Sequence, residues 1–553
     1  MIFGLIKRYH LVKRLFYTLR PLRWRQFTYR FKYIFLPLER FISFTAGNPK
    51  LENWVWAGPS VGKQSIFKDN FVEHLNIRRQ INVGNDWNDS ESSKLWLYNL
   101  HYFDDLNAEG SDFRHDLHVE FIERWIKENP CLLGNGWEAY PLSLRLVNWV
   151  KWLRRTGVNN QSFIDSISIQ AQVLCWRLEH HILGNHLFAN AKALVFVGCY
   201  FKGYEADRFL NIGLKILEEQ VLEQFLDDGG HFELCPMYHS ILLWDLLDLI
   251  NLAQVSNNNR LKAIMPQWMK LSAKAINWLK IMQHPDGEIS FFNDSAFGIA
   301  ASPHQIYDYA ESLGIPEITV EKLGLVTLLD SGYSRIAIAK HVLIFDHASV
   351  GPDYLPGHAH ADTLSFEWSV GRQRVFVNSG TSVYGVSDER LRQRKSAAHN
   401  TVVIDNEDSS EVWSGFRVAR RAYATLIETS EFDGNVCIKA SHDGYTRLKI
   451  PLVHTREIDV RCDCVIIRDS LIGAYGSAKA YFHLHPKITP EQVAPDEIRL
   501  TNVAGDLNLL FKSGRRCRFI KSTWHPKFGE SQCSHKIEVI FDSKILETTI
   551  HAF

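Results

Sequence analysis

The spacing of apolar residues changes once along the chain, near residue 330, and this change limits the fold more than any other feature. From about residue 113 to about residue 285, apolar residues recur at helical spacing, in segments that short breaks containing Gly, Pro or Asn separate. From about residue 334 to the C-terminus they alternate at period two, with turns at Asp-Gly and Ser-Gly. Because the helices precede the strands instead of alternating with them, the sequence predicts two structural units that meet at one seam.

The predicted fold is therefore α+β and multidomain. Seven or more successive helices with short breaks favour an (α/α) toroid over a four-helix bundle, and the alternating half predicts an antiparallel β-sandwich. A chain of 553 residues is also too long for one ordinary core. We expect a basic N-terminal segment with lead-in helices at residues 1–90, the toroid at 91–328 and the β-sandwich at 329–553. Ligand sites favour such a seam.

The charges of the whole chain balance, with 62 basic and 62 acidic residues, so we expect no nucleic-acid partner. The first forty residues differ, because they are basic and aromatic and contain no acidic residue before Glu39. They contain neither a continuous apolar run nor a small-residue cleavage site, so the sequence predicts no cleavable signal peptide. Such a segment either makes peripheral contact with an anionic membrane surface or covers the next domain.

The densest group of titratable side chains is the segment Gly-His-Ala-His-Ala-Asp at residues 357–362. If this segment is a strand, His358, His360 and Asp362 project from one face. Burial of three such groups is costly unless a metal, a substrate anion or a hydrogen-bond network compensates. The segment therefore favours a functional site over a structural histidine cluster.

Further polar clusters occur in both halves, and each has a structural explanation as well. In the helical half, Arg145 with Asn148 belongs to a site or only to helix packing. Asn185 with His186 has helix capping as its structural explanation. Glu233 with Tyr238 and His239 has aromatic packing as its structural explanation. The Asn293-Asp294 pair is predicted to support a site rather than to act in it. In the strand half, the basic run with Arg392, Arg394, Lys395 and His399 suits a carboxylated or sulfated ligand, or a solvated face.

Five motifs in fixed order resemble the heparinase II/III family of polysaccharide lyases, which is related to the oligoalginate lyases. They are GNHLFANAKAL, PMYHSILLWDLLDL, FNDS, GHAHADTLSFEW and HNTVV. The resemblance covers roughly residues 95–553 and implies a toroid joined to a β-sandwich, with the active site in the cleft between them. It also implies β-elimination from a uronic acid within an acidic polysaccharide.

The resemblance implies a role for each candidate residue. The C5 proton of a uronate is weakly acidic, so its carboxylate must be neutralised, and Asn185 matches that position. Tyr238 matches the acid that protonates the leaving O4 and the base for one C5 epimer, whereas His358 matches the base for the other. A phenol of ordinary pKa needs local positive charge to act as a base. The remaining substrate contacts are predicted at His186, Arg145, His239, Tyr384 and Arg394.

The family often binds a metal, commonly zinc, and the matching positions here are His360, Asn378 and His399. The sequence departs from the family at Asn378, where an aspartate is typical. A neutral amide oxygen is a weak zinc ligand, so this departure weakens the predicted zinc site. We expect any metal there to order the cleft rather than to attack the substrate.

Two other interpretations stay open. A His-x-His pair at a strand end also begins metal-dependent hydrolase barrels, although that fold alternates strands and helices. A non-catalytic protein that binds acidic polysaccharides would keep the cleft and lose turnover; Asn378 favours it, and the joint presence of Asn185, Tyr238 and His358 opposes it.

The predicted location follows from the N-terminus and the cysteines. The start of the chain resembles that of family members encoded among polysaccharide-assembly enzymes, which implies editing or trimming of a polymer made by the same cell. We therefore expect the periplasm or cell envelope. The cytoplasm is the alternative, because no cleavable leader is expected and a reduced cytoplasm tolerates free cysteines.

Overall fold

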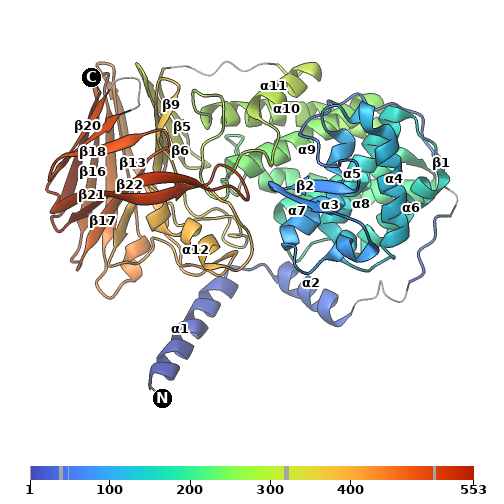
Figure 1. Cartoon of the computed structure of the whole chain (residues 1–553), viewed down its shortest axis with the longest axis horizontal. Helices are drawn as coiled ribbons and strands as arrows, with labels where there is room; N and C mark the ends of the chain where they lie inside the picture. The colour runs from blue at the N-terminus through green and yellow to red at the C-terminus, as the bar shows by residue number, and fades with distance from the viewer. Residues whose placement is uncertain (1, 37–41, 48, 317–322, 502–505, 553) are drawn as a thin grey trace.

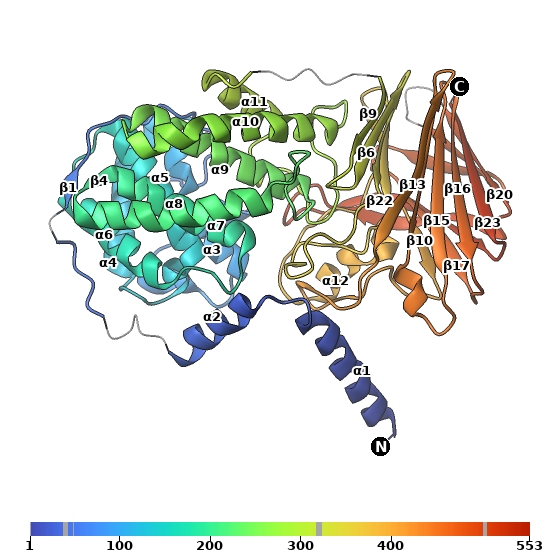
Figure 2. The same ribbon diagram turned by 180° about the vertical axis from the view of Figure 1, so that it is seen from behind.

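The computed structural model describes residues 2–36, 42–47, 49–316, 323–501 and 506–552. A helical domain and a β-domain stand next to each other, and α1 and α2 lie along one side of their junction (Figures 1 and 2). The chain thus places helices first and strands after, which confirms the predicted fold class.

The helical domain alternates inner and outer helices. Its helices are α3 (Lys94–Tyr102), α4 (His115–Glu128), α5 (Ala139–Thr156), α6 (Gln161–Trp176), α7 (Gly184–Tyr200), α8 (Tyr204–Gln224), α9 (Pro236–Val255), α10 (Asn259–Ile281) and α11 (Pro303–Ser312). Helices α5, α7 and α9 contact one another, whereas α6, α8 and α10 pack outside them. The seven helical segments expected from the sequence correspond to α4 through α10.

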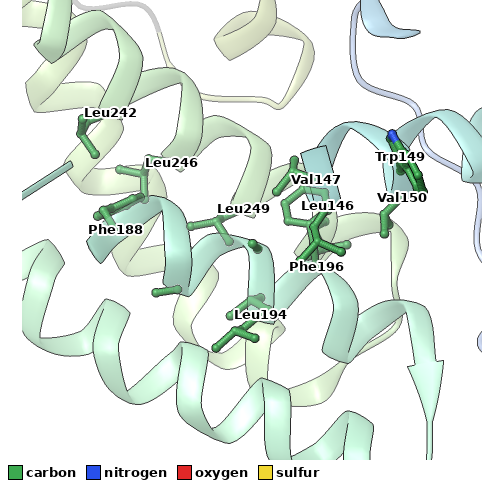
Figure 3. Close-up of a cluster of buried hydrophobic side chains, with 14 of the residues drawn as sticks. Leu146, Val147, Trp149, Val150, Phe188, Leu194, Phe196, Leu242, Leu246 and Leu249 are labelled. Atoms are coloured by element: carbon green, nitrogen blue, oxygen red, sulfur yellow. The ribbon is translucent and has the colours of Figure 1, made fainter. Parts of the chain in front are cut away.

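The inner position of α7 and α9 follows from their composition. Both helices are apolar on nearly every face, and nearly all their residues are buried. Side chains such as Phe188, Phe196, Leu242 and Leu246 meet those of α5 in one core (Figure 3). This core fixes the first turns of α7 and α9 relative to each other.

The β-domain consists mainly of antiparallel sheets around a second core. The five-stranded sheet holds β5 (Gly324–Leu328), β6 (Tyr333–Ile338), β7 (His341–Asp346), β8 (Phe366–Val370) and β9 (Gln373–Phe376), in that order. The four-stranded sheet has the order β10 (Val402–Ile404), β17 (Ala478–His483), β22 (Gln532–Phe541) and β21 (Arg516–Trp524). Strand β5 begins before residue 329, so the strands start earlier than the sequence predicts.

The largest sheet has eight strands and forms the outer layer. Its order is β13 (Ala424–Phe432), β14 (Asn435–His442), β15 (Val453–Val460), β16 (Cys464–Ile472), β23 (Ile545–Ala552), β20 (Leu507–Lys512), β19 (Glu497–Thr501) and β18 (Thr489–Ala494). The short helix α12 (Asp388–Arg394) lies on the side of the β-domain that faces the junction (Figure 1), and it contacts the hairpin of β11 (Val412–Trp413) and β12 (Arg417–Val418).

The N-terminal segment bridges the two domains. Helix α1 (Ile2–Leu19) reaches the β-domain, where Trp413 Nε1 donates to Thr18 Oγ1 at 3.1 Å. Helix α2 (Trp24–Phe35) packs on the helical domain, where Arg25 Nη1 lies 3.2 Å from Glu219 Oε2, and its Gln26 Nε2 donates to the Tyr354 carbonyl of the β-domain at 3.2 Å. Short strands pair nearby, β1 (Lys50–Leu51) with β4 (Phe201–Lys202) and β2 (Phe71–His74) with β3 (Ile77–Gln80). Within the described ranges, none of the helices has the length and apolar character needed to span a bilayer.

Candidate active site

A cavity of about 2010 Å³ lies where the two domains meet. From the helical domain it is lined by the first turns of α5, α7 and α9, which contribute Tyr140, Asn185 and Tyr238. From the β-domain it is lined by His358 and Tyr384. Because helix N-termini carry partial positive charge, a wall built from three of them favours a ligand with an anionic group.

Three aromatic side chains from distant parts of the sequence meet in this cavity. The rings of Tyr238 and His358 stack with their centroids 3.9 Å apart. The Tyr384 hydroxyl lies 3.1 Å from the Tyr238 hydroxyl and 3.4 Å from His358 Nδ1. The structure therefore brings together the predicted acid, the predicted base and one predicted substrate contact.

The segment that carries His358 is a loop between β7 and β8, not the strand that its alternating pattern predicts. Backbone contacts hold the loop, since Arg394 donates to the Ala359 carbonyl at 3.1 and 2.9 Å and the His360 N–H donates to Asn293 Oδ1 at 2.9 Å. His358 and His360 still converge, because both reach Asp294. The two histidines therefore converge because they share Asp294 as a hydrogen-bond partner, and not because they lie on one face of a strand.

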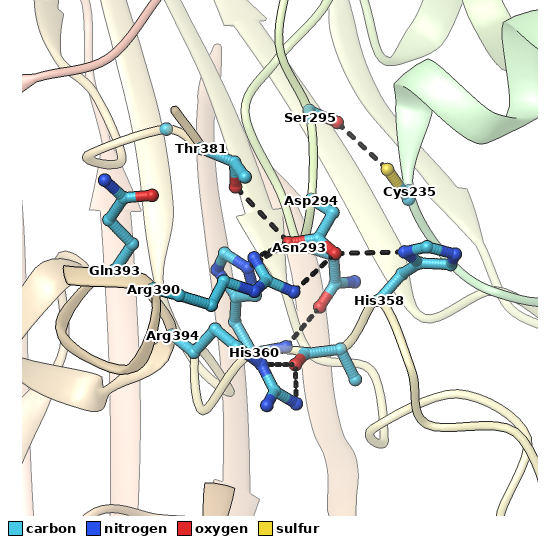
Figure 4. A network of polar contacts seen from close by, with 12 residues as sticks. Cys235, Asn293, Asp294, Ser295, His358, His360, Thr381, Arg390, Gln393 and Arg394 are labelled. Atoms are coloured by element: carbon cyan, nitrogen blue, oxygen red, sulfur yellow. Dashed lines mark hydrogen bonds and ion pairs between the residues drawn. The ribbon is translucent and has the colours of Figure 1, made fainter. Parts of the chain in front are cut away.

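Asp294 is the centre of the polar network in the cleft (Figure 4). Its carboxylate accepts from His358 Nδ1 at 3.0 Å, from His360 Nε2 at 2.8 Å, and from both terminal nitrogens of Arg390. Burial alone would raise the pKa of Asp294, but the charge of Arg390 and the two histidine hydrogen bonds outweigh it and hold the pKa well below its usual value. An ionised Asp294 fixes His358 with its Nδ1 hydrogen toward the carboxylate and leaves Nε2 able to accept a proton.

The surroundings of Tyr238 favour its protonated form. Burial, followed by the nearby Tyr384 and Tyr140, raises the pKa of Tyr238 well above its usual value. The positive charge of Arg390 also acts on Tyr238, but it does not outweigh the burial. The raised pKa therefore suits the predicted acid role of Tyr238 better than its predicted base role.

Asn185 and His186 lie one after the other in the first turn of α7. The helix begins at Gly184 with Leu183 as its N-cap, so Asn185 is inside the helix and is not the cap that the sequence suggested. His186 Nδ1 lies 2.9 Å from Glu179 Oε1. Burial alone would lower the pKa of His186, but the charge of Glu179 outweighs it and raises the pKa, which favours positive charge beside the cavity.

The structure does not bring Arg145, His239 and Arg394 to the cavity, which corrects their prediction as substrate contacts. Each of the three is fully buried. Arg145 donates to the backbone carbonyls of His101 and Gly136, His239 Nε2 lies 2.9 Å from the Ala275 carbonyl, and Arg394 supports the loop of His358. Their polar atoms are satisfied inside the domains, so these side chains hold the cleft walls in place.

The three predicted zinc ligands are neighbours but do not surround one point. His360 Nδ1 lies 3.2 Å from His399 Nε2, whereas Asn378 Oδ1 lies 3.0 Å from the other ring nitrogen of His399. One metal ion cannot bind both nitrogens of one imidazole ring. In the part of the chain that the structure describes, no cluster of three or more His, Cys, Asp or Glu side chains suits a metal. This arrangement does not fit the predicted zinc site.

Two charged residues of the site were missed or left without a role. Arg390 lies in the basic run before His399, but nothing in the sequence distinguished it from its neighbours. Glu233 lies near Tyr238 in the sequence, and its apolar neighbours Phe232, Leu234 and Cys235 are the available signal, because a carboxyl group is rarely buried among apolar residues. Asp294 was expected to support the site, and its contacts agree with that expectation.

Comparison with known proteins finds matches over most of the chain. Residues 155–313 match the family described as Heparinase II/III N-terminus, and residues 322–551 match the one described as Heparinase II/III-like, C-terminal. A heparin-sulfate lyase of Bacteroides stercoris is 23% identical over 494 residues, which covers 78% of this chain and 70% of that protein.

Solved structures share the fold. The crystal structure of heparinase III superposes with a TM-score of 0.68 at 18% identity, over 84% of this chain and 79% of that chain. Heparan sulfate lyase from Pedobacter heparinus gives a TM-score of 0.58 at 16% identity, over 89% of this chain and 84% of that chain. At these identities the likeness concerns the fold alone. The cavity described above lies between the two matched regions.

Proposed function

Because the chain belongs to the heparinase II/III-like family, we propose that it is a lyase that cleaves a uronate-containing acidic polysaccharide by β-elimination. One observation carries this proposal: the rings of Tyr238 and His358 stack with their centroids 3.9 Å apart in the cavity between the two family domains. Elimination needs such an acid and base on one sugar ring.

The proposed reaction uses groups that lie close to one another in the cavity. His358 Nε2 takes the C5 proton, and the electron pair of that bond moves toward the carboxylate. The Tyr238 hydroxyl then gives its proton to O4 as the C4–O4 bond breaks, which leaves a C4–C5 double bond. Tyr384, hydrogen-bonded to Tyr238, supports the phenol during this transfer.

Stabilisation of the enolate-like intermediate is the most demanding step. Asn185 supplies a neutral amide, and His186, whose pKa is raised, supplies positive charge at the start of α7. Electrostatic stabilisation of developing charge in a site that excludes water is often the largest contribution to catalysis. We propose that these two residues contact the uronate carboxylate.

We also propose that the N-terminal helices seat the protein on an anionic membrane surface of the cell envelope, where it trims a polymer made by the same cell. In support, Val12, Trp24, Phe31 and Ile34 are 65%, 79%, 58% and 69% exposed, and no acidic residue precedes Glu39. Sedimentation with anionic and with zwitterionic vesicles tests this contact. Binding to the anionic vesicles alone is expected; binding to neither would contradict it.

The experiment that tests the activity follows ultraviolet absorbance of unsaturated uronate while the protein is incubated with a panel of uronate polymers, including the polysaccharide of its own host. A rise that disappears in Tyr238→Phe and in His358→Ala is expected for at least one polymer. A flat trace on every polymer, with binding still measured by calorimetry, would instead favour the non-catalytic binding protein.

A further inference from the structure

Glu233 is a carboxyl group of the cleft that has no part in the reaction proposed above. It lies just before α9, lines the cavity and is only 3% exposed. Neither of its carboxyl oxygens makes a hydrogen bond of normal geometry among the residues that the structure describes, although the Asn185 backbone N–H is close enough to act on its pKa. Buried polar groups in native proteins are almost always paired, so an unpaired carboxyl group that lines a cavity points to a partner that arrives with a ligand.

The position of Glu233 is fixed from two sides. Its Oε2 lies 3.8 Å from His358 Nε2, the nitrogen that faces away from Asp294. Its Oε1 lies against Gly184, where an added Cβ would be 3.2 Å from that oxygen. The carboxyl group therefore sits between the start of α7, which carries Asn185, and the proposed base.

The charge state of Glu233 follows from its surroundings. Burial raises the pKa of Glu233, and the nearby Asp294 adds to this effect. His358, His186 and the Asn185 backbone N–H oppose the shift without cancelling it. The protonated acid is thus favoured more strongly at this position than for an ordinary glutamate.

Substrate geometry brings a second carboxyl group to the same place. The uronate carboxylate is bonded directly to C5, so it lies within about two bond lengths of the proton that His358 Nε2 removes. Glu233 Oε2 is 3.8 Å from that nitrogen. Two carboxylates so close together do not both ionise, because like charges raise one of the two pKa values strongly.

We propose that Glu233 is a further substrate-contacting catalytic residue, which shares its carboxylic proton with the uronate carboxylate during elimination. This inference rests on the proposed function and adds the group that neutralises the substrate. As the C5–H bond breaks, its proton goes to His358 and its electron pair moves onto the carboxylate oxygens, one of which the Glu233 O–H then holds more tightly. The C4–O4 bond breaks with the Tyr238 proton on O4, and Glu233 ends with the proton it began with.

Two substitutions at one position test the protonated form. Glu233→Gln keeps a neutral donor of the same shape and is expected to retain kcat/KM within about tenfold, whereas Glu233→Ala is expected to lose about 100-fold. Glu288→Gln, which changes another cavity-lining carboxyl group, is the matched control and should stay within about twofold. Equal loss in Gln and Ala would overturn the proposal, because it would mean that an ionised Glu233 is required. Unchanged activity in Ala would overturn it as well.

A binding measurement separates this inference from the proposed activity. In a Tyr238→Phe background, calorimetry compares an intact uronate polymer with the same polymer after reduction of its carboxyl groups. Glu233→Ala is expected to weaken binding of the intact polymer about tenfold and to leave binding of the reduced polymer unchanged. Equal weakening of both polymers would overturn the role of Glu233. A wild-type protein that binds but never produces unsaturated uronate would overturn the proposed function, and the calorimetric comparison would still decide the carboxyl contact.

Discussion

Asp294 in the cleft and Asp469 inside the β-domain are both fully buried and both paired with an arginine and a histidine. Asp469 accepts from Arg456 Nε and Nη2 at 2.8 and 3.0 Å and from His454 Nε2 at 2.8 Å. A second histidine follows in each case, since His454 Nδ1 lies 3.2 Å from His442 Nε2, and His360 Nδ1 lies 3.2 Å from His399 Nε2. The same chain of contacts thus occurs once beside a cavity and once in a sandwich core.

At the far end of each network, a hydrogen-bond partner is available to the last histidine. In the β-domain the Gly444 N–H donates to His442 Nδ1 at 3.1 Å. Each neutral histidine can then accept at Nδ1 and donate from Nε2 to the next group, which ends at Asp469. In the cleft the Asn378 amide takes the equivalent place at His399 Nδ1. Its Nδ2 has no partner within the described structure, and turning the amide over makes that nitrogen the donor. An ionised aspartate at this position has no hydrogen to donate.

The difference between the two networks is a second histidine in direct contact with the carboxylate. Asp294 also holds His358, which lines the cavity beside Tyr238 and Glu233. Asp469 holds only groups inside the sandwich. A buried Asp-His-His network is therefore not by itself a sign of a functional site in this protein. The network of Asp294 belongs to a candidate site because it also holds His358 at the cavity.

The largest expected contrast concerns the tyrosine beside each network. Tyr238→Phe removes the proposed acid and should lower kcat by about 1,000-fold, because positioned acids contribute 100- to 10,000-fold. Tyr445→Phe removes a hydroxyl that donates to the Val402 carbonyl beside His442 and should leave kcat within about twofold. Steady-state rates at saturating polymer measure both. A similar loss of kcat in Tyr238→Phe and Tyr445→Phe would contradict a specific role of Tyr238 in catalysis.

The two carboxylates give a second contrast. Asp294→Asn and Asp469→Asn each leave a buried arginine without its countercharge and should lower the free energy of unfolding by about 3–5 kcal/mol. Only Asp294→Asn should also lower kcat of the folded protein, by about 100-fold, since His358 loses its orienting anion. Denaturant unfolding and active-site titration separate the two effects. An Asp294→Asn protein with full kcat would contradict the orienting role.

Acid should weaken both networks in the same direction. Burial alone would raise the pKa of Asp469, but Arg456 and His454 outweigh it and lower the pKa to about 2. A lowered pKa stabilises the fold above the unfolded value, and this stability is lost as the pH falls toward about 2. For Asp469 the loss amounts to about 2 kcal/mol between pH 4 and pH 2. Denaturant unfolding at several pH values should show a flatter dependence in Asp469→Asn than in the wild type.

The smallest expected effect is that of metal removal. Because Asn378 and His360 lie on opposite nitrogens of His399, dialysis against a strong chelator should leave kcat/KM within about twofold. Activity before and after dialysis, with metal content by mass spectrometry, measures this. A loss that added zinc restores would show that the cleft network, unlike its counterpart in the β-domain, binds metal.

The sequence predicted the parts of the fold and site that periodicity and motif order determine. Helices α4 to α10, the change to strands, and the meeting of Asn185, Tyr238, His358 and Tyr384 in one cavity were all expected. The sequence-based prediction was wrong where residues alternate at period two for a reason other than strand formation. Residues 357–362 alternate small and polar side chains in a loop that Asp294 and Arg394 hold, and period two does not distinguish such a loop from a strand.

The misplaced residues show a second limit of the sequence. Arg145 and Arg394 carry the charge that an anionic substrate needs, yet backbone carbonyls from distant segments satisfy them. Those carbonyls are present in every sequence, so their availability depends on tertiary packing alone. Glu233 shows the opposite case, because only the structure shows that its buried carboxyl oxygens lack a hydrogen bond of normal geometry within the described residues.

The most direct measurement is proton NMR of the products that the protein forms from a polymer it cleaves. β-Elimination predicts a new vinylic proton at C4 for every chain break, absent from Tyr238→Phe and present at normal rate in Tyr445→Phe. Chain breaks whose new ends are saturated on both sides would contradict elimination, and with it the roles of Tyr238 and His358.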